Sequence, residues 1–119
     1  MATTPTKYDP QILARGTLGT TLTTSLHAAV GDAGDRITGI ILTVTGATSR
    51  RVTLDIYDGA NAYMLLPAGT IPANGVGKNA LHMIGLPEGL AINAGDEIRG
   101  GQDVGTDVDY IIVGWAMDD

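Results

Sequence analysis

The 119-residue chain contains no cysteine and no phenylalanine. Without cysteine it can form no disulfide and can offer no thiolate to a metal ion or a substrate. No segment approaches the roughly 18 uninterrupted apolar residues of a transmembrane helix, so none is expected. The opening stretch, MATTPTKYDPQIL, has no apolar run and a single basic residue, so it does not resemble a secretory signal peptide. These absences predict one domain that is held together by packing alone.

Basic residues are also scarce, since 7 Lys and Arg stand against 13 Asp and Glu and leave a net charge of −6. Neutralising phosphates supplies most of the affinity of proteins for nucleic acids, so an acidic chain with scattered basic residues is a poor candidate for that role. The acidity is better explained by solubility and self-repulsion. We expect neither a nucleic-acid partner nor a membrane partner.

Long segments without a structure breaker are missing as well. Seventeen glycines and five prolines divide the chain into pieces of roughly ten residues, and no helix of ordinary length fits between them. The pieces are rich in Thr, Val and Ile, which favour strands. We therefore expect an all-β fold, an antiparallel β-sandwich of about eight short strands in jelly-roll or another Greek-key order. Residues 1–11 are expected to form a flexible or extended N-terminal arm, and residues 12–119 a single sandwich domain.

The strands are expected over residues 13–29, 37–45, 51–57, 62–72, 79–86, 90–92, 96–101 and 108–117. In the first of them, Leu18, Leu22 and Leu26 fit one face of a strand better than a helix, because the threonines around them are β-branched. The glycines and aspartates of residues 31–36 predict a turn.

The segment RVTLDIY (51–57) alternates most clearly, with its apolar residues expected to point inward and Arg51, Thr53 and Asp55 outward. Asp58 and Gly59 follow it and predict a hairpin turn. Pro67 cannot donate to a strand ladder, so the next strand is expected at a sheet edge or bent.

Acidic residues gather in the segment Leu86–Gly101, where they could form a metal or catalytic site or belong to a turn between two strands. We favour the turn, in which Gly95 supplies a positive φ and Asp96 caps the backbone. Calcium in the loop DVGTDVD (103–109) is a weaker possibility, because the spacing matches no EF-hand. The two histidines, His27 and His82, lack a metal-binding spacing.

No arrangement in the sequence resembles an active site. The two serines, Ser25 and Ser49, lie outside a Gly-x-Ser-x-Gly elbow, and the glycine-rich turns precede no helix that could bind phosphate. The aromatic residues are few for a sugar-binding cleft, although Tyr57 or Tyr63 could belong to a shallow one. We therefore expect a protein that is not an enzyme and that holds neither a metal nor a cofactor.

The last strand, VDYIIVGWAM (108–117), is apolar on both faces. Val108, Tyr110 and Ile112 share one face, and the other carries Ile111, Val113 and Trp115. A strand on the outside of a monomeric sandwich should have one polar face. Either another part of the chain or a partner subunit covers the second face, and a partner is favoured.

The order of segments resembles the small all-β virion proteins of tailed bacteriophages, especially the capsid cement or decoration proteins. The resemblance covers most of the chain after residue 11 and is carried by GIILTVTGAT, RVTLDIYDG, LAINAGDEIRGG and VDYIIVGWAM.

This resemblance implies a structural protein on the capsid surface of a virion, assembled in the host cytoplasm and bound to the major capsid protein lattice. It favours a homotrimer, with Ile111, Val113 and Trp115 in the oligomer interface and Lys7, Tyr8 and Ile12 in contact with the lattice. A neck, tail or fibre-associated sandwich, including a glycan-binding module, is the alternative.

Overall fold

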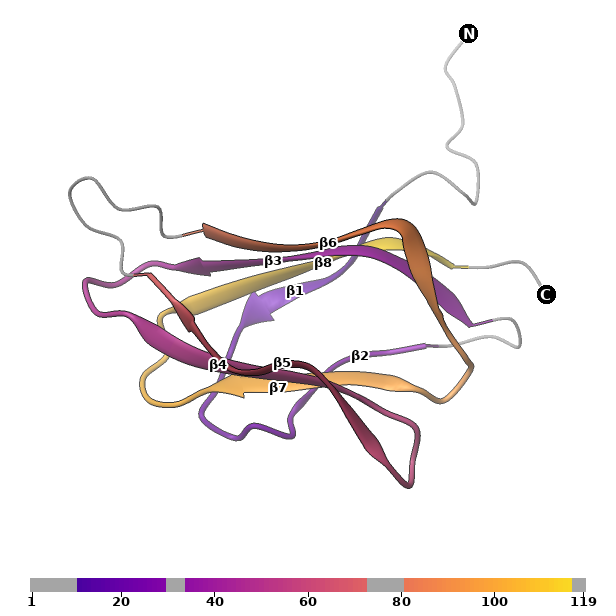
Figure 1. The fold of residues 1–119 in the computed structure, drawn as a ribbon, viewed down its shortest axis with the longest axis horizontal. Coiled ribbons are helices and arrows are strands. Elements are labelled where there is room, and N and C mark those ends of the chain that lie inside the picture. The colour runs from indigo at the N-terminus through magenta and orange to yellow at the C-terminus, as the bar shows by residue number, and fades with distance from the viewer. Residues whose placement is uncertain (1–10, 30–33, 73–80, 117–119) are drawn as a thin grey trace, which may run out of the picture.

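The computed structural model describes residues 11–29, 34–72 and 81–116, and every regular element in these ranges is a strand (Figure 1). The eight strands are β1 (Gln11–Thr17), β2 (Ser25–Ala28), β3 (Asp35–Val44), β4 (Arg50–Tyr57), β5 (Ala62–Ile71), β6 (Leu81–Ile92), β7 (Glu97–Gln102) and β8 (Val108–Ala116). They form two antiparallel sheets that face each other, so the all-β sandwich predicted from the sequence is confirmed.

The two sheets have the strand orders β1-β8-β3-β6 and β2-β7-β4-β5, and are called sheet I and sheet II below. The chain behaves as one long hairpin whose tip is β4–β5 and whose arms pair as β3–β6, β2–β7 and β1–β8. Rolling this hairpin up adds the contacts of β3 with β8 and of β4 with β7. The result is the jelly-roll order, one of the two arrangements that the sequence left open.

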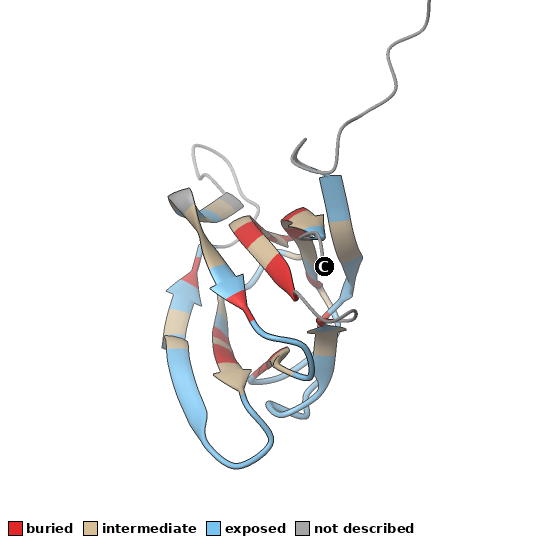
Figure 2. Cartoon of the chain, turned by 90° about the vertical axis from the view of Figure 1, so that its right-hand side faces the viewer, coloured by how far each residue is buried: buried red, intermediate tan, exposed pale blue. Residues whose placement is uncertain are grey.

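The core lies between the sheets because each central strand alternates apolar residues with polar or smaller ones. In β3 the buried side chains of Ile40, Leu42 and Val44 face inward. Figure 2 shows the buried residues on the central strands, whereas β1 and the end of the β4–β5 hairpin are mostly exposed. The fully apolar core comprises Leu18, Ala29, Ile37, Ile40, Leu42, Val44, Val52, Leu54, Ile71, Ile92, Ile98, Val108 and Ile112.

The prediction of a single strand over residues 13–29 was wrong. The chain leaves sheet I after Thr17, crosses to sheet II and pairs again only at Ser25. Leu18 is buried, whereas Leu22 is 43% exposed in the connection, so the leucines do not share a face. The connection is held by main-chain hydrogen bonds to β7, from the nitrogens of Gly100 and Gln102 to the oxygens of Thr24 and Gly19.

The other boundaries differ less from the prediction. Residues 81–92 form one strand rather than two, although its pairing with β3 shifts register between Ile37 and Gly39. Asp35 and Arg36 open β3 instead of closing a turn, while residues 30–33 lie outside the described ranges. This register shift between β3 and β6 lets β6 continue through the segment at which the sequence predicted a break between two strands.

Three turn and edge predictions are confirmed. Asp58 opens the β4–β5 hairpin, and its carboxylate accepts hydrogen bonds from the nitrogens of Ala60 and Asn61. Pro67 lies in β5, an edge strand with two register shifts. Gly95 has a φ of 92°, and Asp96 accepts a hydrogen bond from the nitrogen of Asn93 at 2.8 Å. The stretch 86–101 is therefore a strand, a turn and a second strand.

Candidate functional site

The outer face of sheet I carries the apolar residues that the last strand predicted. Ile111, Val113 and Trp115 alternate with the inward-facing Val108 and Ile112, and none of the three belongs to the core. Each is partly exposed. Since β8 lies between β1 and β3, these side chains occupy the middle of the sheet rather than its edge.

Neighbouring strands extend this apolar surface across the whole sheet. The pairing aligns Arg15, Ile111, Ile41 and Met83 in one row that crosses all four strands. The next row contains Ile12, Val113, Gly39 and Gly85.

The side chains of Ile12 and Met83, at the two margins, are 54% and 59% exposed. We call the surface formed by Ile12, Ile41, Met83, Ile111 and Val113 the sheet-I face.

Charged residues of opposite sign lie beyond the two apolar rows. Toward one end of the strands, Asp109 pairs with Thr17 and Thr43 in the same row. Toward the other end, Arg36 is paired with Trp115. The middle of the face is therefore mostly apolar, with the exposed Arg15 at its β1 margin and the charged residues Asp109 and Arg36 in the rows beyond.

Ile12 does not belong to a separate arm. It is the second residue of β1 and pairs with Val113, so its side chain adjoins the surface assigned to self-association. β1 begins at Gln11, the last residue that the sequence assigned to the arm, and residues 1–10 lie outside the described residues. Lys7 and Tyr8, the other predicted lattice contacts, lie outside the described residues.

Sequence reasoning missed Ile41 and Met83 as members of this surface. The run Ile40-Ile41-Leu42 contained the signal, because three consecutive apolar residues in a strand must place one of them on the outer face. Met83 could be placed only through its pairing with Ile41, which sequence alone does not give.

The outer face of sheet II is mostly polar on β4 and β7, whereas the exposed Met64 of the edge strand β5 pairs with Asp55 there. Asp55 lies there, as predicted, although it is only 4% exposed. Arg99 on β7 covers it, donating from Nε and Nη2 to the two carboxylate oxygens at 2.9 and 3.0 Å. The same guanidinium lies 4.0 Å from the ring centroid of Tyr57. The hydrogen bonds to Asp55 raise the pKa of Arg99, which stays charged.

The tyrosines of the β4–β5 hairpin do not form a common platform for a sugar. Tyr57 pairs with Ala62 and Ile56 pairs with Tyr63, so the two tyrosines point to opposite faces of the hairpin. One face of Tyr57 is also covered by Arg99. Stacking on a glycan would have to rely on Tyr63 alone, which is 58% exposed.

The acidic loop between β7 and β8 has internal partners. Both oxygens of Asp107 accept hydrogen bonds from Arg50, at 2.7 and 3.1 Å, and these hold the pKa of Asp107 below its usual value. Asp103 accepts from the nitrogens of Arg51 and Val104. Asp109 accepts from the hydroxyl of Thr17. The three carboxylates face different partners, and nowhere in the described ranges do three His, Asp or Glu residues gather as a metal would require.

The two histidines lie apart. Nε2 of His27 on β2 is 2.5 Å from the carboxylate of Asp35 on β3, which is 2% exposed, so this pair joins the two sheets. His82 lies on β6 opposite Leu42, at the far edge of sheet I. They therefore do not form a shared metal site.

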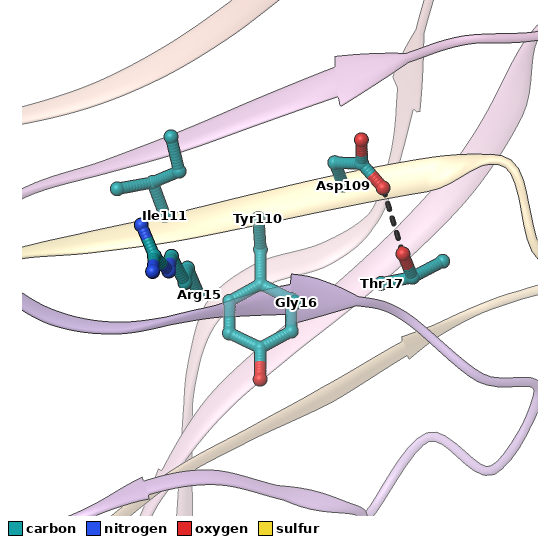
Figure 3. Close-up of a pocket in the computed structure, with 6 residues that line it drawn as sticks. All are labelled: Arg15, Gly16, Thr17, Asp109, Tyr110 and Ile111. Atoms are coloured by element: carbon teal, nitrogen blue, oxygen red, sulfur yellow. Dashed lines mark hydrogen bonds between the residues drawn. The ribbon is translucent and has the colours of Figure 1, made fainter.

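An open hollow of about 480 Å³ lies beside the edge strand β1 (Figure 3). Arg15, Thr17 and Asp109 lie along its rim, and the ring of Tyr110 passes next to Gly16. A methyl group on Gly16 would stand 3.2 Å from the Tyr110 hydroxyl, so glycine leaves room for the ring. The one carboxylate that lines the hollow, that of Asp109, already accepts a hydrogen bond from Thr17. No second carboxylate lines the hollow, so it lacks the acid–base pair of a glycosidase.

Among the residues that the structure describes, no helical segment has the length and apolar character needed to cross a membrane. The chain matches no protein-family profile, no curated protein and no solved structure.

Proposed function

We propose that the protein is a non-enzymatic structural component of a tailed-bacteriophage virion, a cement protein that binds the major capsid protein lattice and stabilises the head. The observation that carries the proposal is the sheet-I face, a mostly apolar surface on a jelly roll whose other sheet is mostly polar outside on β4 and β7. Contiguous apolar patches on soluble proteins mark surfaces that other proteins cover. The resemblance of the sequence to cement proteins is the reason for proposing the capsid as the assembly that the chain joins.

The division of labour between the two sheets supports a mechanical role. On the outer face of sheet II, Arg99 pairs with Asp55. At the start of β4, Arg50 pairs with Asp107 of the loop before β8. Groups that are held in such ion pairs are not free to act as acid, base or nucleophile on a substrate. A stiff sandwich of this kind can bridge capsid subunits and add buried interface at each copy.

The chain is proposed to associate with itself through Ile111, Val113 and Trp115, and with the lattice through the segment that contains Lys7 and Tyr8. Ile12 is assigned to the self-association surface because it adjoins Val113. The homotrimer that the resemblance favours stays a prediction.

Particles released by the host that encodes the chain provide the test. They are purified on a density gradient, and the chain is quantified against the major capsid protein by mass spectrometry. We expect a fixed ratio to the major capsid protein, and heads that lack the chain should release their DNA at a lower temperature. Absence of the chain from the particles would contradict the proposal.

A low copy number, confined to neck, tail or fibre fractions, would move the chain to the alternative class. Binding on a glycan array that Tyr63→Ala abolishes would point to a sugar-binding module in that class. The matched control is Met64→Ala, which removes the adjacent exposed side chain, 59% exposed, without removing a ring.

A further inference from the structure

We propose that the edge of β6 pairs with the same edge of a second copy, so that sheet I continues from one copy into the other. The two copies are related by a two-fold axis perpendicular to the sheet. This contact goes beyond the proposed function and does not rest on it. It uses the edge of the sheet and leaves the sheet-I face uncovered.

The described sheets have four edge strands, β1 and β6 in sheet I and β2 and β5 in sheet II. An edge strand offers unpaired main-chain groups to other strands, and proteins block such pairing with charges, prolines, bulges or very short strands. Three of the four edges carry such a device. β1 contains the exposed Arg15 and a register shift, β2 has only four residues, and β5 contains Pro67 and two register shifts.

The stretch Leu81–Gly85 of β6 carries none of these devices. Its pairing with β3 runs without a register shift. It contains no proline and no Asp, Glu, Lys or Arg, since Pro87 and Glu88 come after it. Met83, in its middle, is 59% exposed. These five residues are therefore a regular, uncharged edge to which another strand can be added.

A second copy of the chain fits this edge. The added strand must itself offer unpaired main-chain groups in a regular stretch, and within the described ranges only Leu81–Gly85 does so. A two-fold axis brings such a stretch antiparallel to its own copy, so the same residues serve both sides. Copies of a chain with a net charge of −6 repel each other, and an uncharged edge adds no facing charges to that repulsion.

The regular stretch also sets the register. Full overlap of the five residues centres on Met83, which then lies opposite Met83 of the second copy, while residue 81 lies opposite Gly85. Opposite residues of an antiparallel pair share a face, so the two methionines stay on the outer face with Cβ atoms about 5 Å apart. A methyl group on Gly85 would meet nothing within 4 Å, so the space beside the strand is open in the single chain.

The charged margin of sheet I takes no part in this contact. Arg15 lies on β1, three strand spacings or about 14 Å from β6, and therefore stays exposed to solvent. The axis places the outer faces of both copies on the same side. Ile111, Val113 and Trp115 thus stay accessible for the association that the proposed function assigns to them.

The contact is short. Five paired residues span about 17 Å, so the pair buries less than the roughly 1,600 Å² of a standard interface. We therefore expect a weak monomer–dimer equilibrium in solution. The same contact gains strength wherever many copies are held side by side.

Cysteine cross-linking of the full chain tests the register, because the chain has no cysteine of its own. Met83→Cys should form a disulfide-linked dimer under mild oxidation, since the opposed residues lie within the distance that a disulfide spans. Gly85→Cys is the matched control on the same strand and the same face. Its two cysteines would lie four residues apart, about 14 Å along the strands, and should not cross-link.

Charge variants at the same position test the pairing itself. Met83→Lys and Met83→Glu each place two like charges opposite each other. In sedimentation velocity, either variant should dimerise about fivefold or more weakly than the wild type. An equimolar mixture of M83K and M83E should regain a dimer at least as stable as that of the wild type, because the opposed charges then differ in sign. A fold disturbed by the substitution would not regain pairing on mixing.

The matched controls are Leu22→Lys and Leu22→Glu, which make the same charge changes at a side chain that is 43% exposed. Leu22 lies in the connection between β1 and β2, at the margins of the sheets opposite to β6 and β5. Both variants should leave the equilibrium unchanged. Thermal unfolding of each variant establishes that it folds.

A wild-type chain that stays monomeric at about 1 mM, equal cross-linking of the two cysteine variants, or a mixture that fails to pair would overturn the inference. Each of these results leaves the proposed place of the chain in virions untouched. Conversely, absence of the chain from virions would overturn the proposed function and leave the edge contact standing.

Discussion

Gly114 lies on β8 at the point where the main chain of β3 comes nearest. A Cβ atom there would stand 2.0 Å from the carbonyl oxygen of Arg36, which is main chain and cannot move aside like a side chain. The register shift of β3 between Ile37 and Gly39 occurs beside it. Glycine at this position is therefore required by space and not by an unusual φ.

Gly114→Ala should destabilise the fold by about 2 kcal/mol or more, as overpacking against a backbone does. Gly85→Ala on β6 is the matched control, since its new methyl group meets nothing within 4 Å. Urea unfolding of both variants measures the difference. Equal midpoints for the two would show that β3 and β8 are farther apart than described.

The ion pair of Asp107 with Arg50 predicts a dependence on pH. Hydrogen bonds from Arg50 hold the pKa of Asp107 below its ordinary value of 3.8 in the folded chain. The stability gained is fully present above pH 4 and is lost as the pH falls through the folded value. Asp107→Asn should thus lower the urea midpoint at pH 7 and lower it less at pH 3.

The comparison needs a variant in the same loop that leaves the ion pair in place. Val104→Ala shortens an uncharged side chain that is 52% exposed and should keep the wild-type difference between pH 7 and pH 3. If Asp107→Asn also kept that difference, the ion pair would contribute nothing to acid sensitivity.

At the scale of the elements, the sheets are joined at one end by a polar contact. His27 on β2 and Asp35 on β3 meet across the sandwich, and both side chains are largely buried. β2 has only four residues and pairs with β7 alone, so few other contacts hold it in place. The pair fixes the short strand β2 relative to sheet I.

A double-mutant cycle measures this contact. Removing one partner, by His27→Ala or Asp35→Ala, should cost about 1–3 kcal/mol because the other polar group stays buried without its partner. The double variant should cost less than the sum of the two single ones. Additive costs in urea unfolding would mean that the two side chains act independently.

For the whole molecule, the order of pairing predicts how the chain folds. Among the described strand pairs, only β4–β5 is joined by a short turn, and the others join strands that are progressively farther apart in sequence. Pairing strands that are far apart in the sequence costs chain entropy before the contacts between them stabilise the fold. Folding should therefore take on the order of milliseconds to seconds and begin at the hairpin.

Two variants test that order in stopped-flow experiments. Gly59 has a φ of 96° in the hairpin turn, so Gly59→Ala should mainly slow folding. Ile112→Val, in the core on β8, should mainly accelerate unfolding, because β8 pairs last. The reverse assignment of the two effects would place the nucleus at β1–β8.

The sequence by itself determined the all-β class, the turns at Asp58 and Gly95 and the doubly apolar last strand. These follow from side-chain alternation and from turn chemistry, which act within a few residues. The sequence did not predict that residues 13–29 divide into two strands. The alternation of side chains is the same whether the chain continues in one sheet or crosses to the other.

Only the tertiary structure decided the strand order and the composition of the sheet-I face. Which strands lie side by side depends on contacts between distant residues, as in the row from Arg15 to Met83. The burial of Asp55 by Arg99 has the same origin, since the two are 44 residues apart. Local patterns fix which way a side chain points, whereas its neighbours are fixed by the folding of the whole chain.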